Sequence, residues 1–457
     1  MQPAAKTWPP TTTVEFSYLW GMGEKIKDHR VLLEKLGITE LNDMQKKACQ
    51  AIAERAEVVL LSPTGSGKTL AFLLPLLDQL DLELEAVQAL ILTPSRELAL
   101  QIEQVLRDMG SGFKVNAVYG GRSKYQDRHD LQHPPAVLIG TPGRIADHFR
   151  RNPTMGTHVR TLILDEFDKS LEVGFAEEMK AIVRTLPAVD KKVLTSATQK
   201  IDIPAFIRLQ DPQTLIFQGQ DQRLTLKTVV SPTRDKLEAL GNLLGQLGQA
   251  RGIIFCNFKD TIRFVSEYLQ KKGIGHAVFY GGLEQIAREQ ALVQFRNGSH
   301  RLLLATDLAA RGIDVPELDF IIHYQLPPRK EEFVHRNGRT ARMHSEGVAY
   351  LIRHQEEYLP DFVEGASDLY LQDSPSPPPT ARATLLLSGG RRDKISKGDI
   401  AGFLIKQGDL LADQVGLIEL KQDCAFVAVP RNQARQLART LNNGRLKKRT
   451  VRVSLLS

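Results

Sequence analysis

The sequence predicts an α/β fold with two parallel-sheet domains and a small α+β domain at the C-terminal end. Three observations support this prediction. Short β-like runs alternate with amphipathic helical runs from 20 to about 217, and the alternation resumes from 252 to about 363. A polar stretch separates the two halves, and a proline-rich stretch ends the second. Alternating strands and helices are typical of a parallel sheet that is covered by helices.

These breaks divide the chain into five parts. We expect a first sheet domain over 1–217, a linker over 218–228 and a second sheet domain over 229–362. A proline-rich linker over 363–382 and a C-terminal domain over 383–457 follow. The second linker contains the run SPSPPP at 374–379, which favours an extended, semi-rigid chain.

The expected strands are short and apolar. In the first sheet domain they lie at 58–61, 89–93, 114–119, 137–140, 161–165 and 192–196. In the second they lie at 252–256, 276–280, 301–305 and 320–324. The C-terminal domain has the order β-α-β-β-α-β, with strands at 384–387, 416–420, 424–429 and 450–454 and helices at 397–405 and 433–441. That order is the split β-α-β pattern of small α+β folds.

The composition is that of an ordinary globular protein, with 42% hydrophobic and 25% charged residues in a chain of 457. Cys49, Cys256 and Cys424 are far apart and form no CxxC pair, which argues against a disulfide framework or a zinc site. No signal pattern opens the chain, and the longest apolar run, near 70–77, is too short to span a bilayer. We expect a cytoplasmic monomer with no membrane contact.

Positive charge is concentrated near the C-terminal end. The net charge is +7, but the segment 380–457 holds fifteen Lys and Arg residues against six Asp and Glu residues. Such an excess is typical of a domain that binds a polyanion. A solvated basic surface without such a partner is the alternative.

The segment SPTGSGKT at 62–69 is the most informative motif. It follows an apolar run at 58–61 and precedes a helical pattern at 70–80, which is the order that a phosphate-binding loop requires. Ser62 stands where the pattern usually has glycine. The motif predicts that the chain binds a nucleoside triphosphate.

The residues of this loop have separate expected roles. Gly65 and Gly67 allow backbone N–H groups to point at phosphate oxygens. Lys68 reaches the β- and γ-phosphates, and the Thr69 hydroxyl binds Mg²⁺. The expected nucleotide contacts of the loop are Thr64, Gly65, Ser66, Gly67, Lys68 and Thr69.

A run of acidic residues, DEFD at 165–168, follows the apolar strand expected at 161–165. Carboxylates at the C-terminal end of a strand lie in the crevice where α/β sheets bind ligands. We expect Asp165 to hold Mg²⁺, partly through water, and Glu166 to orient or deprotonate the attacking water. Asp168 is expected to couple the site to a domain interface. The alternative is an acidic cap at the start of a helix.

Together these motifs resemble those of the DEAD-box RNA-dependent ATPases, with DEFD in place of DEAD. The resemblance runs from about Trp20 to about Leu351. It implies two RecA-like domains of the P-loop NTPase, superfamily 2 helicase type, with ATP and Mg²⁺ as cofactors. Phe167 replaces an alanine of the family, so the three acids remain while the packing behind them is expected to change.

Residues 37–45 resemble the adenine-reading motif of the family. A glutamine in that motif pairs with adenine, which implies that Gln45 selects ATP. Trp20 lies at the position of the family's upstream aromatic residue, which implies that it stacks on the adenine. Leu41 and Asp43 replace two prolines of the family motif.

Several further segments resemble the RNA-contacting and coupling motifs of the family. The RNA contacts use backbone N–H groups and short side chains that grip the phosphate–sugar backbone. The implied RNA contacts in the two sheet domains are Pro94, Arg96, Gly120, Gly121, Thr141, Arg144, Arg288 and Thr306. The residues implied to couple the ATP site to the interface are Asp168, Ser196, Thr198 and His335.

Two arginines lie three residues apart in the segment HRNGR at 335–339, on one side of a helical turn. The resemblance implies that they face the γ-phosphate across the cleft, with Arg339 as the arginine finger and Arg336 as a phosphate or interface contact. It also implies that Asp314 binds the ribose or a partner motif. Surface salt bridges are the alternative. The implied catalytic residues are Lys68, Asp165, Glu166, Arg336 and Arg339.

The C-terminal domain resembles the RNA-binding module of the bacterial DbpA group of DEAD-box proteins, through its segments at 391–399, 402–404 and 425–427. An RNA-recognition fold offers stacking aromatic residues at two places on its third strand, and here Phe426 occupies one and Cys424 the other. The implied RNA contacts of this RRM-like domain are Phe426, Arg445, Lys447, Lys448 and Arg449. A basic docking domain without RNA selectivity is the alternative.

The resemblance implies an ATP-dependent RNA helicase that locally unwinds or remodels structured RNA. For a bacterial member of the group it points to ribosomal RNA, bound through the C-terminal domain, and to ribosome biogenesis at the large subunit. Two alternatives stay open: an ATP-gated RNA clamp or scaffold without productive unwinding, and a DNA helicase.

Overall fold

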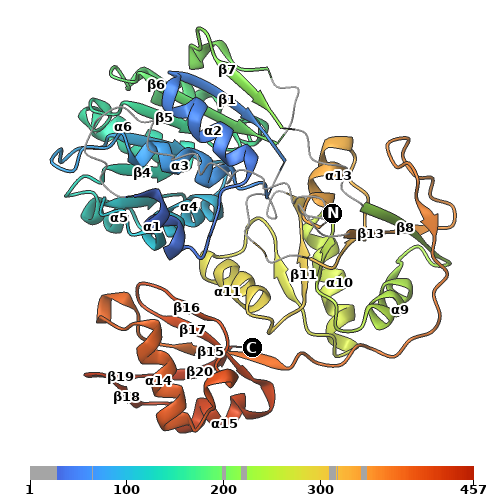
Figure 1. The fold of residues 1–457 in the computed structure, drawn as a ribbon. Helices are drawn as coiled ribbons and strands as arrows, with labels where there is room; N and C mark the ends of the chain where they lie inside the picture. The colour runs from blue at the N-terminus through green and yellow to red at the C-terminus, as the bar shows by residue number, and fades with distance from the viewer. Residues whose placement is uncertain are drawn as a thin grey trace, which may run out of the picture.

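The computed structural model describes residues 28–63, 65–197, 202–217, 224–307, 315, 318–340 and 347–456. Figure 1 shows two domains of sheets and helices side by side, with a smaller C-terminal domain against them. Across the described ranges, no helix combines the length and the apolar character that are needed to cross a membrane. Four residues with expected roles lie outside these ranges: Trp20, Thr64, Thr198 and Asp314.

The first domain is built on a seven-stranded parallel sheet with the order β3-β4-β2-β5-β6-β1-β7. Its strands are β1 (Glu57–Leu61), β2 (Ala89–Leu92), β3 (Val115–Val118), β4 (Val137–Gly140), β5 (Thr161–Leu164), β6 (Lys191–Ser196) and β7 (Gln213–Ile216). Buried apolar clusters include residues from both faces of the sheet. Because both faces are covered, the central strands are near-continuous apolar runs.

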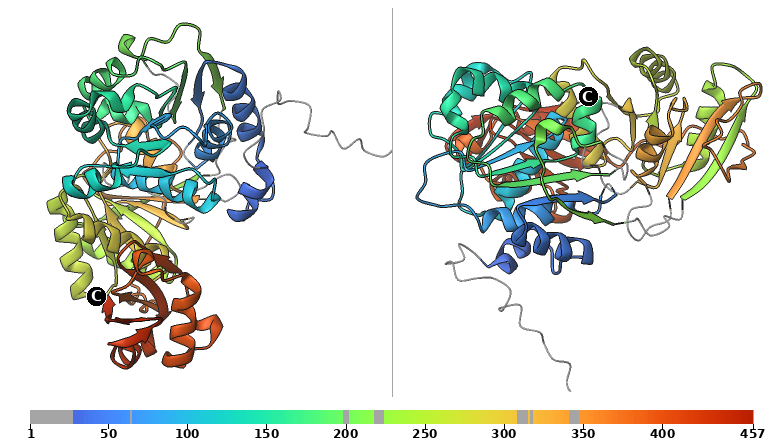
Figure 2. Two further views of the ribbon diagram at one scale, coloured as in Figure 1. Left: turned by 90° about the vertical axis from the view of Figure 1, so that its left-hand side faces the viewer. Right: turned by 90° about the horizontal axis from the view of Figure 1, so that it is seen from above.

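Helices lie on both sides of this sheet (Figure 2). Ser95 caps α4 by accepting a hydrogen bond from the Leu98 N–H, and the helix ends at Gly110, whose φ of +59° suits glycine. The helices are α1 (His29–Lys35), α2 (Asp43–Glu54), α3 (Lys68–Leu77), α4 (Arg96–Met109), α5 (Lys124–Asp130), α6 (Pro142–Arg151), η2 (Pro153–Gly156), α7 (Phe167–Glu172), α8 (Ala176–Arg184) and η3 (Ala205–Ile207).

The second domain repeats this plan with the strand order β10-β11-β9-β12-β13-β8-β14, again in parallel. Its strands are β8 (Leu224–Ser231), β9 (Gly252–Phe255), β10 (Ala277–Phe279), β11 (Leu302–Ala305), β12 (Phe320–His323), β13 (Gly347–His354) and β14 (Ser367–Asp368). Its helices are α9 (Leu237–Leu247), α10 (Lys259–Lys271), α11 (Gln285–Arg296) and α13 (Lys330–Asn337).

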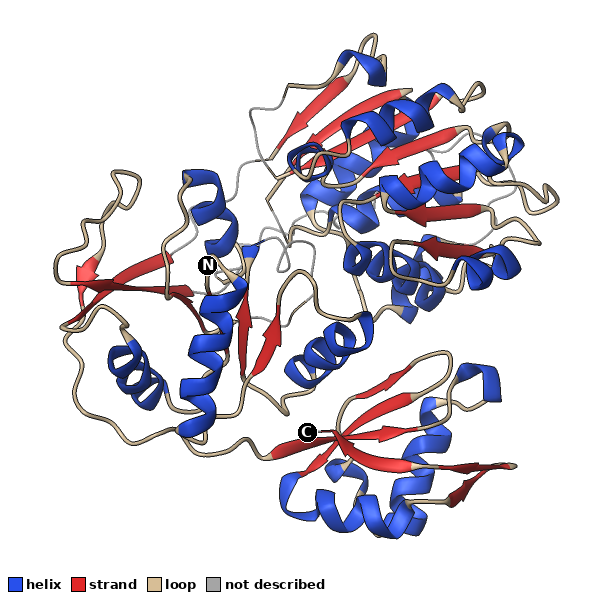
Figure 3. Ribbon diagram, turned by 180° about the vertical axis from the view of Figure 1, so that it is seen from behind, coloured by secondary structure: helices blue, strands red, loops and turns tan. Residues whose placement is uncertain are grey.

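The C-terminal domain has a four-stranded antiparallel sheet with the order β16-β17-β15-β20 and a separate hairpin, β18–β19. Figure 3 shows its two long helices on one face of the sheet, where the core of the domain lies. The elements are β15 (Arg382–Leu387), η4 (Arg391–Asp393), α14 (Lys397–Gly408), η5 (Ala412–Gln414), β16 (Ile418–Leu420), β17 (Ala425–Pro430), α15 (Arg431–Leu441), β18 (Gly444–Leu446), β19 (Arg449–Val451) and β20 (Val453–Leu456).

The expected fold class is confirmed, since two parallel-sheet domains precede an antiparallel α+β domain. The strand expected at 450–454 is divided between β19 and β20. Among the described residues, five strands lie outside the predicted set: β7, β8, β13, β14 and β18. The expected linker at 218–228 overlaps β8, and the linker expected at 363–382 contains β14, which pairs with β8. β7 and β14 are edge strands with exposed residues, so they lack the apolar runs that mark buried strands.

Candidate functional site

The phosphate-binding loop connects β1 to α3 in the first domain. Gly65 and Gly67 have φ values of +79° and +85°, which favour glycine, and Gly67 caps α3. A Cβ atom on Gly67 would lie 2.3 Å from Nε2 of Gln45. The loop therefore requires glycine at 67 both for its backbone conformation and for the close approach of Gln45.

Serine side chains tie the loop together. The Ser62 hydroxyl donates to Oγ of Ser66 at 2.8 Å, and the Ser66 hydroxyl donates to the Pro63 carbonyl at 2.8 Å. Ser62, which replaces the usual glycine, is therefore part of the hydrogen-bonded framework of the loop.

Lys68 is buried at the start of α3, where its Nζ donates to the carbonyls of Ser62 and Pro63 at 2.6 and 2.9 Å. Burial lowers the pKa of Lys68, whereas the charges of Glu166, Asp165 and Asp168 raise it. This places the ammonium group among the acidic residues that follow β5, within the same site.

The acidic run begins where β5 ends. Asp165 is buried and accepts a hydrogen bond from the Thr195 hydroxyl, and Oγ1 of Thr195 in turn accepts the N–H of Glu166 at 3.2 Å. Burial raises the pKa of Asp165, and the Thr195 hydrogen bond and the Lys68 charge oppose this rise. Thr195 is a site residue that the motif search missed. Its signal is a hydroxyl within the apolar part of β6, one residue before Ser196.

Glu166 occupies a strained backbone position. Its φ of +46° is in the left-handed region, which is uncommon for residues other than glycine and is found at functional sites. Burial and the charge of Asp165 raise the pKa of Glu166, whereas Arg339 and Lys68 lower it. A raised pKa suits a carboxylate that takes a proton from water.

Phe167 explains how the chain tolerates DEFD. Its side chain is fully buried and belongs to the apolar cluster that also holds Phe149, Met179 and Leu194. Asp168 is also buried, and its Oδ2 lies 3.6 Å from Nζ of Lys169. The bulky ring fills the core behind the acids, while the acids themselves remain at the end of β5.

Gln45 has a structural role that the adenine-reading expectation did not include. Its Oε1 accepts the Asn42 N–H at 3.0 Å while its own N–H donates to Oδ1 of Asn42 at 2.9 Å, which forms a capping box at the start of α2. Its Nε2 donates to the Gly67 carbonyl at 3.2 Å. The Gln45 amide therefore fixes the phosphate-binding loop, and its contact with adenine stays a prediction.

Arg336 is buried among partners of the second domain. It is 1% exposed, and its Nε and one terminal nitrogen donate to both carboxylate oxygens of Asp307, at 2.6 and 2.5 Å. Its other contacts are Asn257, the Gln325 carbonyl and the face of Phe255. These contacts of Arg336 lie within its own domain, and its expected role as a phosphate or interface contact stays a prediction.

Arg339 acts on the first domain from the second. It is 7% exposed, and its charge lowers the pKa of both Lys68 and Glu166. Its expected role as an arginine finger, which stabilises charge on the transferring phosphoryl group, stays a prediction. Ser196 and His335, two residues expected to couple the site, lie in β6 and α13; the Ser196 carbonyl accepts the Ser62 N–H at 3.0 Å.

A cavity of about 420 Å³ lies between the two domains, and six of the eight RNA contacts expected in these domains line it. Its lining from the expected set consists of Pro94, Arg96, Gly120, Thr141, Arg144 and Arg288. Gly121 lies beside Arg96, whose guanidinium nitrogen would lie 2.7 Å from a Cβ at that position. Thr306 follows β11 and is not among the residues that line the cavity.

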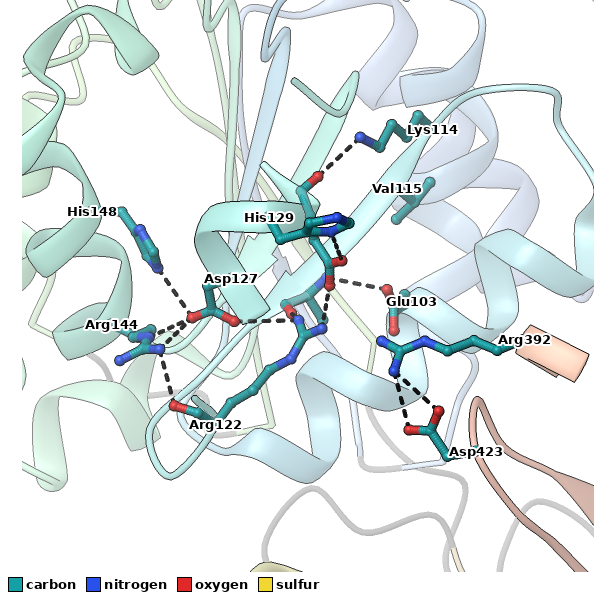
Figure 4. A network of polar contacts seen from close by, with 12 residues as sticks. Glu103, Lys114, Val115, Arg122, Asp127, His129, Arg144, His148, Arg392 and Asp423 are labelled. Carbon is teal, nitrogen blue, oxygen red and sulfur yellow. Dashed lines mark hydrogen bonds and ion pairs between the residues drawn. The ribbon is translucent and has the colours of Figure 1, made fainter. Parts of the chain in front are cut away.

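The arginines of this cavity have protein partners. Arg96 donates to Oε1 of Gln285 at 3.3 Å, and Arg288 donates to Oε1 of Glu97 at 2.8 Å, so both contacts join the two domains. Figure 4 shows Arg144 on the Asp127 carboxylate, with a separation of 2.6 Å from Nε to Oδ2.

Asp127 is the centre of a buried charge network. Arg122, Arg144 and His148 all contact its carboxylate (Figure 4). Burial alone would raise the pKa of Asp127, but the hydrogen bonds from His148 and Arg144 hold it below its usual range. The network therefore fixes Arg144 at the wall of the cavity.

The expected RNA contacts of the C-terminal domain separate into two groups. Phe426 is 3% exposed, so its ring is closed to base stacking in this structure. Arg445, Lys447, Lys448 and Arg449 are exposed on or beside the hairpin β18–β19. Lys447 contacts Asp399 at 2.7 Å, and Arg449 contacts Asp393. The exposed members of the expected set therefore lie on or beside the hairpin, while Phe426 on the third strand is buried.

Family profiles match all three domains. The DEAD/DEAH box helicase profile matches residues 42–205, the helicase conserved C-terminal domain profile matches 235–344, and the DbpA RNA binding domain profile matches 384–455. The chain is 34% identical over 441 residues to the ATP-dependent RNA helicase DbpA of Escherichia coli, which covers 93% of this chain and 96% of that protein.

This chain belongs to the DEAD-box helicase family.

A second relative is the ATP-dependent RNA helicase DbpA of Bacillus subtilis, at 29% identity over 92% of this chain and 96% of that protein. The solved structure of S. cerevisiae Dbp5 bound to RNA and ADP BeF3 matches the fold with a TM-score of 0.66, at 24% identity over 76% of this chain and 94% of that one. As a family member with these domains, the chain is an RNA-dependent ATPase and helicase with a DbpA-type C-terminal domain.

Proposed function

We propose that this helicase remodels structured ribosomal RNA during assembly of the large ribosomal subunit, with the C-terminal domain as the RNA tether. The match of residues 384–455 to the DbpA RNA binding domain supports an RNA ligand for this domain. The exposed hairpin residues Arg445, Lys447, Lys448 and Arg449 supply the positive charge that a phosphate backbone attracts.

The single observation that carries the catalytic proposal is the effect of Arg339 on Lys68 and Glu166. A charge from the second domain acts on the two groups of the first domain that are expected to bind phosphate and orient water. Closure of the two domains then completes the site, because neither domain holds all of its charged groups. RNA bound in the interdomain cavity favours closure, which links RNA binding to ATP hydrolysis.

In this mechanism each side chain has a defined task. Lys68 contacts the phosphates, Glu166 orients the attacking water and accepts its proton, and Arg339 stabilises the charge that develops on the phosphoryl group. Thr69 and Asp165 supply the oxygen ligands that Mg²⁺ prefers, and the ion neutralises phosphate charge when bound. Thr195 holds the Asp165 carboxylate in position.

Two variants test the catalytic proposal. Lys68→Ala should abolish RNA-stimulated ATP hydrolysis, and Arg339→Ala should lower kcat by about 10³-fold or more. Arg263→Ala, at an exposed position on α10 beside Asp260, is the matched control and should leave hydrolysis unchanged. ATP hydrolysis that is equally fast without RNA would contradict the closure mechanism.

The ribosomal target needs its own experiment. The full chain is crosslinked to total cellular RNA, and the recovered RNA is sequenced beside that of a variant with alanine at 445, 447, 448 and 449. We expect enrichment of large-subunit ribosomal RNA that the variant loses. Enrichment of other RNAs would overturn the target and leave the helicase activity standing. ATP-dependent RNA binding without release of a model duplex would instead favour the clamp.

A further inference from the structure

The face of the C-terminal sheet that the helices of this domain do not cover is also buried. In β17, Ala425, Val427 and Val429 belong to the core of the domain. Phe426 and Ala428 alternate with them and so point to the opposite, outer face. They are nevertheless only 3% and 1% exposed.

Strand register identifies the other members of this outer face. Glu419 pairs with Phe426, and Thr384 pairs with Ala428, so both pairs project from the same side of the sheet. Thr384 is fully buried although it is polar. A buried hydroxyl requires hydrogen-bond partners, and these come from the second helicase domain.

The end of α11 supplies the contacts. Arg296 donates through Nε and a terminal nitrogen to both oxygens of Glu419, at 2.8 and 2.7 Å. Nδ2 of Asn297 donates to Oγ1 of Thr384 at 2.8 Å, and the Ser299 hydroxyl lies 2.7 Å from the same atom. A two-point arginine–carboxylate contact fixes orientation as well as distance.

The same segment also fastens the chain that leads into the C-terminal domain. The Ser299 carbonyl accepts the Thr380 hydroxyl at 2.8 Å and a guanidinium N–H of Arg431 at 3.0 Å. Arg301 donates to the Pro378 carbonyl at 3.1 Å. Linker, sheet and α15 therefore all attach to one region of the second domain.

The C-terminal domain has a weaker contact with the first helicase domain than with the second. Arg391 donates to Oε1 of Gln104 on α4 at 3.4 Å, which is long for a hydrogen bond between a charged donor and an amide oxygen. The C-terminal domain is thus held far more firmly by the second domain than by the first.

We propose that the second helicase domain and the C-terminal domain form one rigid body, fastened through the outer face of the C-terminal sheet by Arg296–Glu419 and the Thr384 hydrogen bonds. This face is a docking surface within the chain and is closed to RNA bases. When the helicase domains open, the C-terminal domain follows the second domain and the Arg391–Gln104 contact breaks.

Fluorescence energy transfer on the full chain tests this proposal. Cys424→Ser removes the partly exposed native thiol, and Cys49 and Cys256 are buried. One dye pair joins exposed positions in the second and C-terminal domains, introduced by Lys271→Cys and Lys406→Cys. A second pair joins the first and C-terminal domains, through Arg151→Cys and Lys406→Cys. The distance distribution of each dye pair is measured on the chain without ligands and again with a non-hydrolysable ATP analogue plus single-stranded oligouridylate.

We expect the first dye pair to give one narrow distance distribution under both conditions, while the second pair changes. Arg296→Glu should broaden the distribution of the first pair, and the double reversal Arg296→Glu with Glu419→Arg should narrow it again. Arg263→Glu is the charge-matched control. If the first dye pair gives the same distance distribution in Arg296→Glu as in the parent chain, the proposal is overturned. A broad distribution of the first pair in the parent chain would also overturn it.

Discussion

Arg288 of the second helicase domain forms an ion pair with Glu97 of the first, with 2.8 Å between Nε and Oε1. Both side chains are nearly buried, and the guanidinium also stacks on Phe279 at 4.5 Å from the ring centroid. Arg288, which is expected to contact RNA, therefore joins the two domains at the wall of the interdomain cavity through Glu97.

Replacing Arg288 should weaken RNA binding. Arg288→Ala removes a charged donor from the cavity wall, and such a contact contributes about 1.5–3 kcal/mol, or roughly 10–100-fold in affinity. The measurement is the dissociation constant for single-stranded RNA with a non-hydrolysable ATP analogue. Arg263→Ala serves as the control, and an unchanged RNA affinity would exclude Arg288 from the RNA site.

Thr195 should be needed for turnover. Thr195→Val keeps the shape of the side chain but removes the hydroxyl that donates to Asp165 and accepts from the Glu166 N–H. Loss of a partner for a buried carboxylate costs about 1–3 kcal/mol, and kcat should fall by about tenfold or more. Thr195→Ser retains the hydroxyl and should restore most of the rate. Equal rates for the valine and serine variants would rule out this role.

Phe167 should contribute more to the stability of the first domain than to the rate of ATP hydrolysis. Phe167→Ala restores the family's residue but leaves a cavity in the cluster around Phe149 and Met179. We expect the free energy of unfolding of the first domain to fall by about 3–5 kcal/mol, as measured by denaturant titration. Phe167→Leu should lower the free energy of unfolding less than Phe167→Ala does. If Phe167→Ala leaves the unfolding midpoint unchanged, the ring does not support the core.

Acid should destabilise the second domain through His323. Burial and the charge of Arg336 lower the pKa of His323 to about 3. The unfolded chain takes up a proton below its ordinary pKa of about 6.5, whereas the folded chain does not, so stability is full above that pH and falls between about 6.5 and 3. His323→Gln should flatten the pH dependence of unfolding in this window.

His129 provides the control for that measurement, because its side chain is 71% exposed. His129→Gln should leave the pH dependence as it is in the parent chain. A parent chain whose unfolding free energy is constant from pH 6.5 to 4 would contradict the prediction for His323.

Local chemistry in the sequence determined much of this protein. The loop at 62–69 needed glycine at 65 and 67 for left-handed backbone, and the central strands needed apolar runs because both faces of each sheet are covered. Such requirements act within a few residues, so they can be read without the fold. The same holds for the acidic run that follows β5 and for the excess of positive charge near the C-terminal end.

Only the tertiary structure decided which partner each charged side chain has. Arg336 and Arg339 are three residues apart, yet one is bound to Asp307 in its own domain and the other acts on Lys68 across the cleft. Thr195 gains its role from a neighbouring strand, and Phe426 loses access to RNA because α11 packs on the outer face of its sheet. These outcomes depend on contacts between residues far apart in the chain, which spacing and composition do not specify.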